Sequence, residues 1–304
     1  MLFNEYTIID TISKGNFGAN YKASKVGSQD FFLIKEIKKA SMLNLSGTIE
    51  ILKNINHPNI LKFIDSKEDP DKIYIIFEYC NGGSLEQYLM EKQKPFSEEE
   101  VQYIVKQVVE ALKYLNEKGI VHRDLVISNL LINYESEEDL NQKNILKAKI
   151  KLADFSLSTY LEKGKLLDQA AGNTKYIPPE ILRHQSYDET IDIWSLGVVC
   201  SLLLANSYPY DNKALLHDND ANYFLPETLS KEAVSFINCI FQYDPKLRKK
   251  APLLMKHKFL CKNVKEFNKI NIEDIKEHIE DSKIKINIKD NQWVSKYFGS
   301  GIDE

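Results

Sequence analysis

An α+β fold in two lobes, a small strand-rich one followed by a larger helical one, is predicted by a change of pattern along this 304-residue chain. Short apolar runs broken by turns, at 6–12, 31–37 and 73–79, are typical of strands. Later apolar residues recur at helical spacing after a capping box formed by Ser97 and Glu100. Strands first and helices afterwards favour two packed parts of different class.

The domain boundaries follow from the same patterns. We expect the strand-rich lobe at 1–80 and the helical lobe at 81–260. Within the second lobe, 193–204 is apolar on nearly every side, which indicates a buried helix. The polar stretch 133–148 interrupts two strand-like runs and is predicted to be an exposed insertion. Residues 261–304 form a C-terminal extension, for which packing on the domain and docking of a partner both stay open.

Composition excludes several classes of protein. With 43% hydrophobic residues, 28% charged residues and a net charge of −4, the chain is typical of globular proteins and has no basic surplus for nucleic acid. Its four cysteines form no C-x-x-C pair, so neither a zinc site nor a disulfide framework is expected. No apolar run approaches the roughly 18 residues of a membrane span, and the first residues lack the order of a signal peptide. We expect a cytoplasmic protein.

A glycine-rich turn and a lysine suggest a phosphate site. Gly15, Phe17 and Gly18 follow the first predicted strand, where backbone N–H groups can lie over phosphates. Alone, two glycines three residues apart are more often a plain turn. Lys35 falls in an apolar strand, where a buried ammonium needs an anionic partner. A phosphate would satisfy it.

The strongest signal is Val-His-Arg-Asp-Leu-Val-Ile-Ser-Asn-Leu-Leu at 121–131, followed by Lys-Leu-Ala-Asp-Phe-Ser at 151–156. Phosphoryl transfer needs a carboxylate to orient a hydroxyl, then an amide oxygen and a second carboxylate to hold Mg²⁺ on nucleotide phosphates. These stretches resemble the protein kinase family of the Ser/Thr type. Further matches, in the family's order, are Pro178-Pro179-Glu180, the run Asp192-Ile193-Trp194-Ser195-Leu196-Gly197, and Arg248. The run at 81–85 and Tyr187-Asp188 are similar to calcium-dependent and autophagy-initiating kinases.

The resemblance implies that ATP and Mg²⁺ are cofactors and that a protein hydroxyl receives the γ-phosphate. It implies a protein substrate or a regulatory protein partner, and leaves the oligomeric state open. The implied catalytic residues are Asp124, Lys35 and Asn129, and the implied metal ligands are Asn129 and Asp154. The implied nucleotide-binding residues are Gly15, Phe17, Gly18, Asn20, Leu33, Lys35, Glu78, Cys80 and Leu131. His122 is expected to be a core histidine, not a general base.

Several positions depart from the family pattern. Thr48 stands where a glutamate anchors the strand lysine, and Glu50, about 200° further around a helix, cannot replace it without a rotated helix. Val126 replaces a lysine that clamps the γ-phosphate. Leu33 and Asn20 replace the alanine and valine on the two faces of the adenine ring. Losing one preorganised donor typically reduces the rate by about 10²–10³.

Two hypotheses therefore stay open: a slow or atypical Ser/Thr kinase, and a pseudokinase that acts as a scaffold or allosteric partner with weak or no nucleotide binding. We expect Lys35 to turn toward Asp154, and nucleotide to bind through metal and phosphate more than through adenine. Ser84 and Ser128 replace the acids that select arginine in substrates, so a basophilic kinase is not expected. Asp168 is expected to supply the negative charge that Arg123 normally receives from a phosphorylated activation segment.

Overall fold

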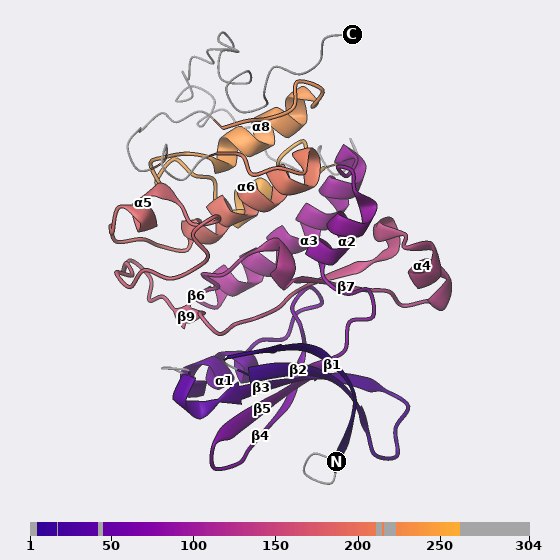
Figure 1. Cartoon of the computed structure of the whole chain (residues 1–304). Coiled ribbons are helices and arrows are strands. Elements are labelled where there is room, and N and C mark those ends of the chain that lie inside the picture. Colours follow the sequence, from indigo (N-terminus) through magenta and orange to yellow (C-terminus); the bar gives the residue numbers. More distant parts are fainter. Residues whose placement is uncertain (1–4, 17, 42–44, 211–214, 216–222, 262–304) are drawn as a thin grey trace, which may run out of the picture. The chain divides into compact units, whose positions relative to one another are not determined.

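The computed structural model describes residues 5–16, 18–41, 45–210, 215 and 223–261, all within one compact unit at 1–262. A strand-rich part precedes a helical part (Figure 1). This confirms the predicted α+β fold with a small strand-rich N-lobe and a larger helical C-lobe. Nearly all of the predicted extension at 261–304 lies outside the described residues.

The N-lobe sheet is antiparallel, with strand order β1-β2-β3-β5-β4. Its central strands are β-branched and aromatic, and bury Ile34, Ile37 and the run at 74–77. The β1–β2 hairpin closes with Gly15 opposite Gly18, where an added Cβ at Gly18 would come within 1.8 Å of a backbone oxygen. The strands are β1 (Tyr6–Gly15), β2 (Gly18–Lys25), β3 (Phe31–Lys38), β4 (Phe63–Glu68) and β5 (Lys72–Glu78).

One helix lies against this sheet. A 3₁₀ turn, η1 (Lys39–Ser41), precedes α1 (Leu45–Asn54), which lies beside the sheet in Figure 1. Ile51 and Leu52 are buried in the main core, and so is the threonine at position 48. One face of α1 is therefore fixed against the domain, which also fixes the side on which its few polar residues lie.

The C-lobe is built around two long helices that the sequence predicts. α3 (Glu98–Glu117) begins at the Ser97 capping box and buries one apolar stripe, whereas α6 (Thr190–Ala205) is buried from Thr190 to Leu204. The capping box and the buried helix expected at 193–204 are thus confirmed. The other helices are α2 (Leu85–Lys92), α4 (Glu137–Gln142), α5 (Pro179–Leu182), α8 (Lys231–Ile240) and α9 (Ala251–Leu254).

Two short pairs of strands lie at the lobe boundary and carry the site. β6 (Ile120–Val121) pairs with β9 (Thr159–Tyr160), and β7 (Leu130–Asn133) pairs with β8 (Lys149–Leu152). The isolated bridge between Ile60 and Leu152 connects β8 to the chain that leads into β4. The β8 strand therefore contacts both lobes.

The polar insertion between β7 and β8 is exposed in its middle and docked near its ends. It contains α4 and the 3₁₀ turn η3 (Ile145–Lys147). Tyr134 and Ile145 are buried, and the Tyr88 hydroxyl on α2 donates to the carbonyl of Lys143, whose ammonium pairs with Glu91. The predicted exposure is confirmed for most of 135–143, whereas the buried side chains near the two ends of the insertion dock it against the domain.

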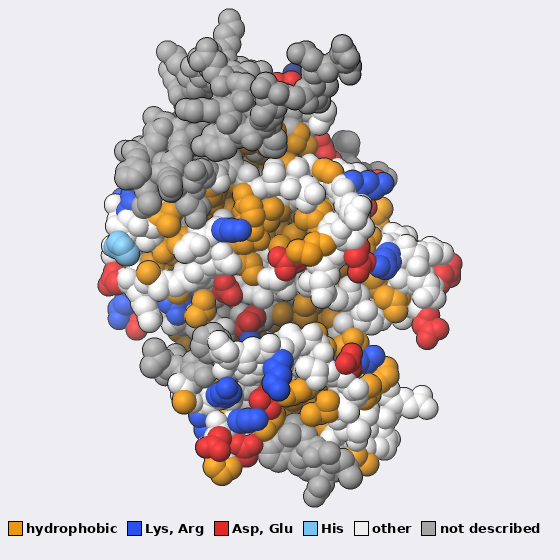
Figure 2. Space-filling model, viewed as in Figure 1, with side chains coloured by type: hydrophobic (Ala, Val, Ile, Leu, Met, Phe, Trp, Pro, Cys, Tyr) orange, Lys and Arg blue, Asp and Glu red, His pale blue; other side chains and the backbone are white. Residues whose placement is uncertain are grey.

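The main apolar core runs through both lobes and includes side chains from β3, α1, β5, α3, α6 and α8. On the face shown in Figure 2, basic side chains are interspersed with acidic and hydrophobic ones. In the part of the chain that the structure describes, no helix is long and apolar enough to cross a bilayer.

Candidate active site

Three turns of the chain bring the predicted catalytic and metal-binding residues together. Asp124 follows β6, Asn129 ends the 3₁₀ turn η2 (Ile127–Asn129), and Asp154 follows β8. The hairpin of β7 and β8 continues one step beyond its strands, because the N–H of Ala153 donates to the carbonyl of Asn129 at 2.8 Å. Residues 25 or more apart in sequence are thus held at one end of a short hairpin.

Lys35, on β3, contacts the carboxylate of Asp154. Its Nζ lies 2.7 Å from Oδ1 of Asp154, which confirms the expected turn of the lysine toward this aspartate. The N–H of Ser156 donates to the same oxygen at 3.2 Å. Burial acts to raise the pKa of Asp154, but the Lys35 ammonium and these hydrogen bonds hold that pKa below its usual range. Asp154 is therefore ionised at neutral pH.

Asp124 and Asn129 form a second polar pair. The amide nitrogen of Asn129 donates to the carbonyl of Asp124 at 2.9 Å and to its Oδ2 at 3.0 Å. Burial and then the charge of Asp154 raise the pKa of Asp124, while hydrogen bonds from Asn129 and from the backbone of Asn173 act against the shift. An aspartate in this setting can orient and accept a proton from a hydroxyl.

Two oxygens of this group suit a magnesium ion. Among the described residues, no hydrogen bond reaches the amide oxygen of Asn129, and Lys35 and the Ser156 N–H both contact Asp154 at Oδ1, one of its two carboxylate oxygens. Within that same part of the chain, no group of three His, Cys, Asp or Glu side chains could hold a metal by itself. Mg²⁺ is commonly held by one or two protein oxygens together with phosphate oxygens and water, so this donor set fits it as a partner of nucleotide.

A cavity of about 140 Å³ lies over these residues, below the roughly 300–1,000 Å³ of usual ligand pockets. Of the predicted site residues, the cavity is lined by Asn20, Leu33, Lys35, Asn129, Leu131 and Asp154. Asp124, Gly15, Gly18, Glu78 and Cys80 do not line it, and Phe17 lies outside the described residues. The phosphate and metal end is therefore open, whereas the hinge end is not part of the cavity.

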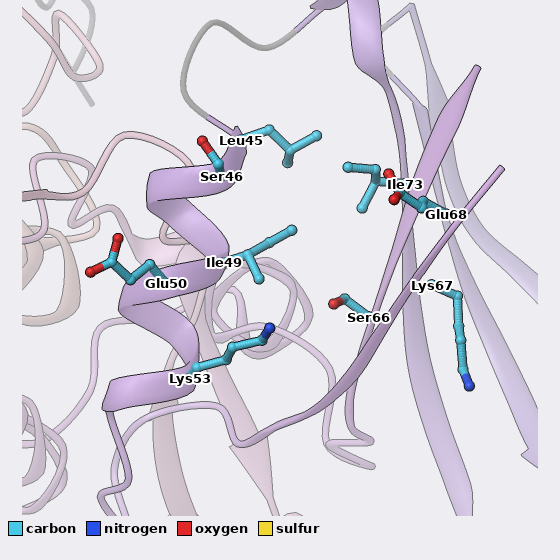
Figure 3. Close-up of a pocket in the computed structure, with 9 residues that line it drawn as sticks. All are labelled: Leu45, Ser46, Ile49, Glu50, Lys53, Ser66, Lys67, Glu68 and Ile73. Carbon is cyan, nitrogen blue, oxygen red and sulfur yellow. The ribbon is translucent and has the colours of Figure 1, made fainter. Parts of the chain in front are cut away.

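The α1 helix presents threonine, not glutamate, to this cavity. Thr48 is buried and lines the cavity that Lys35 lines. Glu50 is exposed and borders a different groove of about 490 Å³ between α1 and β4. Figure 3 shows Glu50 pointing to the side of the helix opposite Ile49, which faces the strands. In the described structure, Asp154 is accordingly the acidic partner of Lys35.

The other departures also alter the cavity. Val126 is buried, and Lys35 is the basic side chain among the described cavity lining. Leu33 pairs with Phe77 across β3 and β5 and packs against the main core. Asn20 is directed into the β1–β2 hairpin, where its amide nitrogen donates to the Ser13 hydroxyl at 2.9 Å. A leucine and a hydrogen-bonded amide thus occupy the two faces where the family leaves room for a base.

Sequence reasoning missed the partner of Glu78. The Lys151 ammonium, with 9% of its side chain exposed, lies 2.7 Å from Oε1 of Glu78, and the N–H of Lys62 donates to the same oxygen at 2.9 Å. The pair joins β8 of the C-lobe to the end of β5 in the N-lobe. The position of Lys151 within an apolar strand indicates that this lysine needs an acidic partner, but nothing in the sequence identifies Glu78 as that partner.

The expected pairing of Arg123 with Asp168 is wrong. Arg123 instead donates to the carbonyl of Leu157 at 2.6 Å and to the Tyr187 hydroxyl at 3.2 Å. Asp168 accepts a hydrogen bond from the hydroxyl of Ser186 at 2.6 Å. The acid is one residue from the expected position in sequence, but the segment turns its carboxylate toward Ser186 and not toward the guanidinium.

Two supporting residues lie where the sequence places them. His122 is fully buried, contacts the Phe155 ring edge-on and is hydrogen-bonded to the Ala153 carbonyl at 3.1 Å. Burial lowers its pKa to about 4, which keeps it neutral and confirms a core histidine. Arg248 makes a two-point ion pair with Glu180, at 2.8 and 3.2 Å, as the resemblance implies.

A strand-rich lobe, a helical lobe, and a lysine, two aspartates and an asparagine gathered between them define a protein kinase domain. The sequence model described as "Protein kinase domain" matches residues 6–260. The chain belongs to the protein kinase family.

The curated relatives agree with this assignment. The chain is 31% identical to myosin light chain kinase A of Dictyostelium discoideum over 287 residues, 90% of this chain and 94% of that protein. It is 32% identical to a probable myosin light chain kinase of the same organism over 278 residues, 86% of this chain and 85% of that protein. It is 30% identical to serine/threonine-protein kinase PLK4 of Xenopus laevis over 84% of this chain, but spans 27% of that protein.

Proposed function

We propose that the chain is a Ser/Thr protein kinase that transfers the γ-phosphate of ATP to a protein hydroxyl, slowly. Bound Mg²⁺ would neutralise charge on the β- and γ-phosphates. Asn129 and Asp154 are assigned to hold it through the amide oxygen of Asn129 and a carboxylate oxygen of Asp154. The observation that carries the proposal is the convergence of Asp124, Asn129 and Asp154 at one end of the β7–β8 hairpin.

Each residue has a role that follows from its contacts. Asp124 orients the acceptor hydroxyl and accepts its proton, and its raised pKa improves it as a base. Asn129 fixes the Asp124 carboxylate through the 3.0 Å hydrogen bond. Lys35 contacts the α- and β-phosphates when it leaves Asp154. We therefore propose that the resting contact between Lys35 and Asp154 opposes nucleotide binding.

Two departures support slow transfer. Thr48 gives Lys35 no carboxylate to hold it over the phosphates, and buried Val126 supplies no charge to the γ-phosphate. Each loss of a preorganised group reduces the rate by about 10²–10³. The two losses fall on the same phosphates, so their combined effect is smaller than the product of the single effects.

Leu33 and Asn20 support weak adenine binding. An overpacked apolar site costs about 1–3 kcal/mol, which is about one to two decades in affinity. We expect calorimetry to show that ATP binding depends on Mg²⁺ and tightens roughly 10–100-fold in Leu33→Ala. Leu247→Ala is a matched control, because that leucine is 63% exposed on the surface of the C-lobe. Micromolar ATP affinity that Leu33→Ala leaves unchanged would contradict the crowding argument.

The second candidate function is a pseudokinase that acts as a scaffold or allosteric partner. It is favoured by the small cavity, which the hinge residues do not line, and by the contact between Lys35 and Asp154. Thermal unfolding discriminates the two, because ligand at a hundred times its Kd stabilises the fold by about 2.7 kcal/mol. Stabilisation by ATP with Mg²⁺ that is lost in Asp154→Asn supports the kinase, and no stabilisation at millimolar ATP supports the scaffold.

A further inference from the structure

The activation segment is hydrogen-bonded to the loop before α6 at three consecutive residues. Leu167 and Tyr187 exchange two backbone hydrogen bonds, at 2.8 and 2.9 Å. The Ser186 hydroxyl donates to Asp168 at 2.6 Å, and the Tyr187 hydroxyl donates to the carbonyl of Gln169 at 2.6 Å. None of these contacts needs a phosphate, so the segment is fixed at this point by unmodified residues.

The Tyr187 hydroxyl also connects this point to Arg123. It accepts a hydrogen bond from the guanidinium at 3.2 Å while it donates to Gln169. A hydroxyl has one proton and can accept as well, so both contacts form together. Arg123 meets the segment a second time at the Leu157 carbonyl. Within the described structure it forms no ion pair with an acidic side chain, and neutral oxygens of the segment take that place.

Burial of the Tyr187 ring fixes the place of its hydroxyl. The residue is 2% exposed, and its ring packs with Val121, Ile177, Ile181 and Ile191. A buried hydroxyl without partners costs free energy, so the ring position and the two hydrogen bonds support each other. Val121 precedes the catalytic loop and Ile177 lies in the activation segment, so this cluster joins Tyr187 to both parts of the chain.

The same segment returns onto the catalytic aspartate. Gly172 has a φ of 109°, and a Cβ there would come within 2.6 Å of the carbonyl oxygen of Arg123. The next residue, Asn173, donates a backbone hydrogen bond to the carboxylate of Asp124. Displacement of the segment would thus move a donor away from the group that orients the acceptor hydroxyl.

We propose that Tyr187 is a positioning residue whose hydroxyl holds Arg123 and the activation segment together, so that the segment is ordered without phosphorylation. The proposal rests on the proposed function only in assigning the catalytic role to Asp124. It differs from the sequence prediction, which assigned the charge at Arg123 to Asp168. A neutral hydroxyl contacts Arg123 instead, and Asp168 accepts a hydrogen bond from Ser186, the residue before Tyr187.

Amide hydrogen exchange tests directly whether the Tyr187 hydroxyl orders the activation segment. Tyr187→Phe keeps the ring and removes both hydroxyl contacts, so exchange across 163–172 should become at least about tenfold faster, because one neutral hydrogen bond and one from a charged donor are lost together. Tyr160→Phe is the matched control, because that hydroxyl is in the same segment but its residue is 44% exposed, and the hydroxyl accepts a 3.4 Å hydrogen bond from Asn54, outside the contacts of Arg123. Its exchange should equal that of the unmodified protein.

Phosphatase treatment is the second arm. The treated and untreated proteins should exchange alike across 163–172. Unchanged exchange in Tyr187→Phe, or faster exchange after phosphatase treatment, overturns the proposal. If the protein transfers phosphate, Tyr187→Phe should lower kcat, counted per folded molecule, and leave the KM for ATP unchanged. Hydrogen exchange needs no catalytic turnover. If exchange is faster in Tyr187→Phe but the protein transfers no phosphate, the positioning role of Tyr187 stands and the proposed kinase activity is refuted.

Discussion

Thr48→Glu should move the Lys35 ammonium from Asp154 to the new carboxylate on α1. Position 48 is 3% exposed and lines the same cavity as Lys35, so a carboxylate there has an ammonium within reach and little water. Asp154 would then keep its charge without an ammonium on Oδ1, and Mg²⁺ would no longer compete with Lys35 for this carboxylate. Phosphate transfer should therefore become faster.

The burial of these side chains sets the expected free energies. The side chains of Lys35 and Asp154 are 26% and 32% exposed, so their contact is worth at most about 1 kcal/mol, and exchanging it loses little. A carboxylate buried at position 48 without an ammonium costs about 3–5 kcal/mol. Thr48→Glu should thus be tolerated beside Lys35 and strongly destabilising in a Lys35→Met protein. We expect a coupling free energy of at least about 2 kcal/mol between the two positions.

Urea unfolding of the four proteins of this cycle measures the coupling, and transfer of radiolabelled phosphate measures the rate. Transfer should rise by up to about 10²–10³ in Thr48→Glu alone. Glu50→Thr is the matched control: Glu50 is exposed on the same helix and lies outside the cavity of Lys35, so neither measurement should change. Additive effects within about 0.5 kcal/mol would show that position 48 does not reach Lys35 and would refute the reasoning.

Three further outcomes are expected. A peptide array should show no strong selection for arginine upstream of the target hydroxyl, because Ser84 and Ser128 offer no carboxylate to a guanidinium; strong selection for arginine would contradict this. Burial and then the charge of Lys249 lower the pKa of His257 to about 4, below its unfolded value near 6.5. The neutral form therefore stabilises the fold above pH 6.5, and the free energy of unfolding should fall between pH 6.5 and 4, less steeply in His257→Gln; equal slopes would exclude this histidine. Arg248→Met leaves a buried carboxylate unpaired and should cost about 3–5 kcal/mol, or roughly 6–20 °C in Tm, whereas Lys250→Met, in an exposed pair, should cost under about 1 kcal/mol in calorimetry.

The parts of the fold that the sequence predicts well are those that repeat. The helix over 98–117 has a capping box and one apolar stripe, and the helix over 190–205 is apolar all round, so periodicity alone identifies both. The insertion at 133–148 has no such pattern. Its docking depends on Tyr134 and Ile145, whose burial is set by α2 and not by their neighbours in sequence.

In the site too, some contacts can be predicted from the sequence and others cannot. The contact between Lys35 and Asp154 can be predicted, because the absence of a glutamate at position 48 leaves the ammonium one acidic neighbour. The contacts of Arg123 with Tyr187 cannot, since they join polar side chains 64 residues apart that follow no period. An acid at position 168 was a reasonable substitute by sequence distance, but the backbone pairing of Leu167 with Tyr187 decides which way the segment faces.

The departures from the family pattern act on different ends of one cavity, and this predicts an order of binding. At the metal end, the amide oxygen of Asn129 accepts no hydrogen bond within the described structure, and Mg²⁺ competes with one ammonium contact at Asp154. At the base end, Leu33 packs against the core, and adenine must move it. Nucleotide should therefore enter phosphates first, after or together with the metal. Tripolyphosphate with Mg²⁺ should then bind nearly as well as ATP with Mg²⁺, and calorimetry would contradict this order if the adenosine part contributed more than about one decade of affinity.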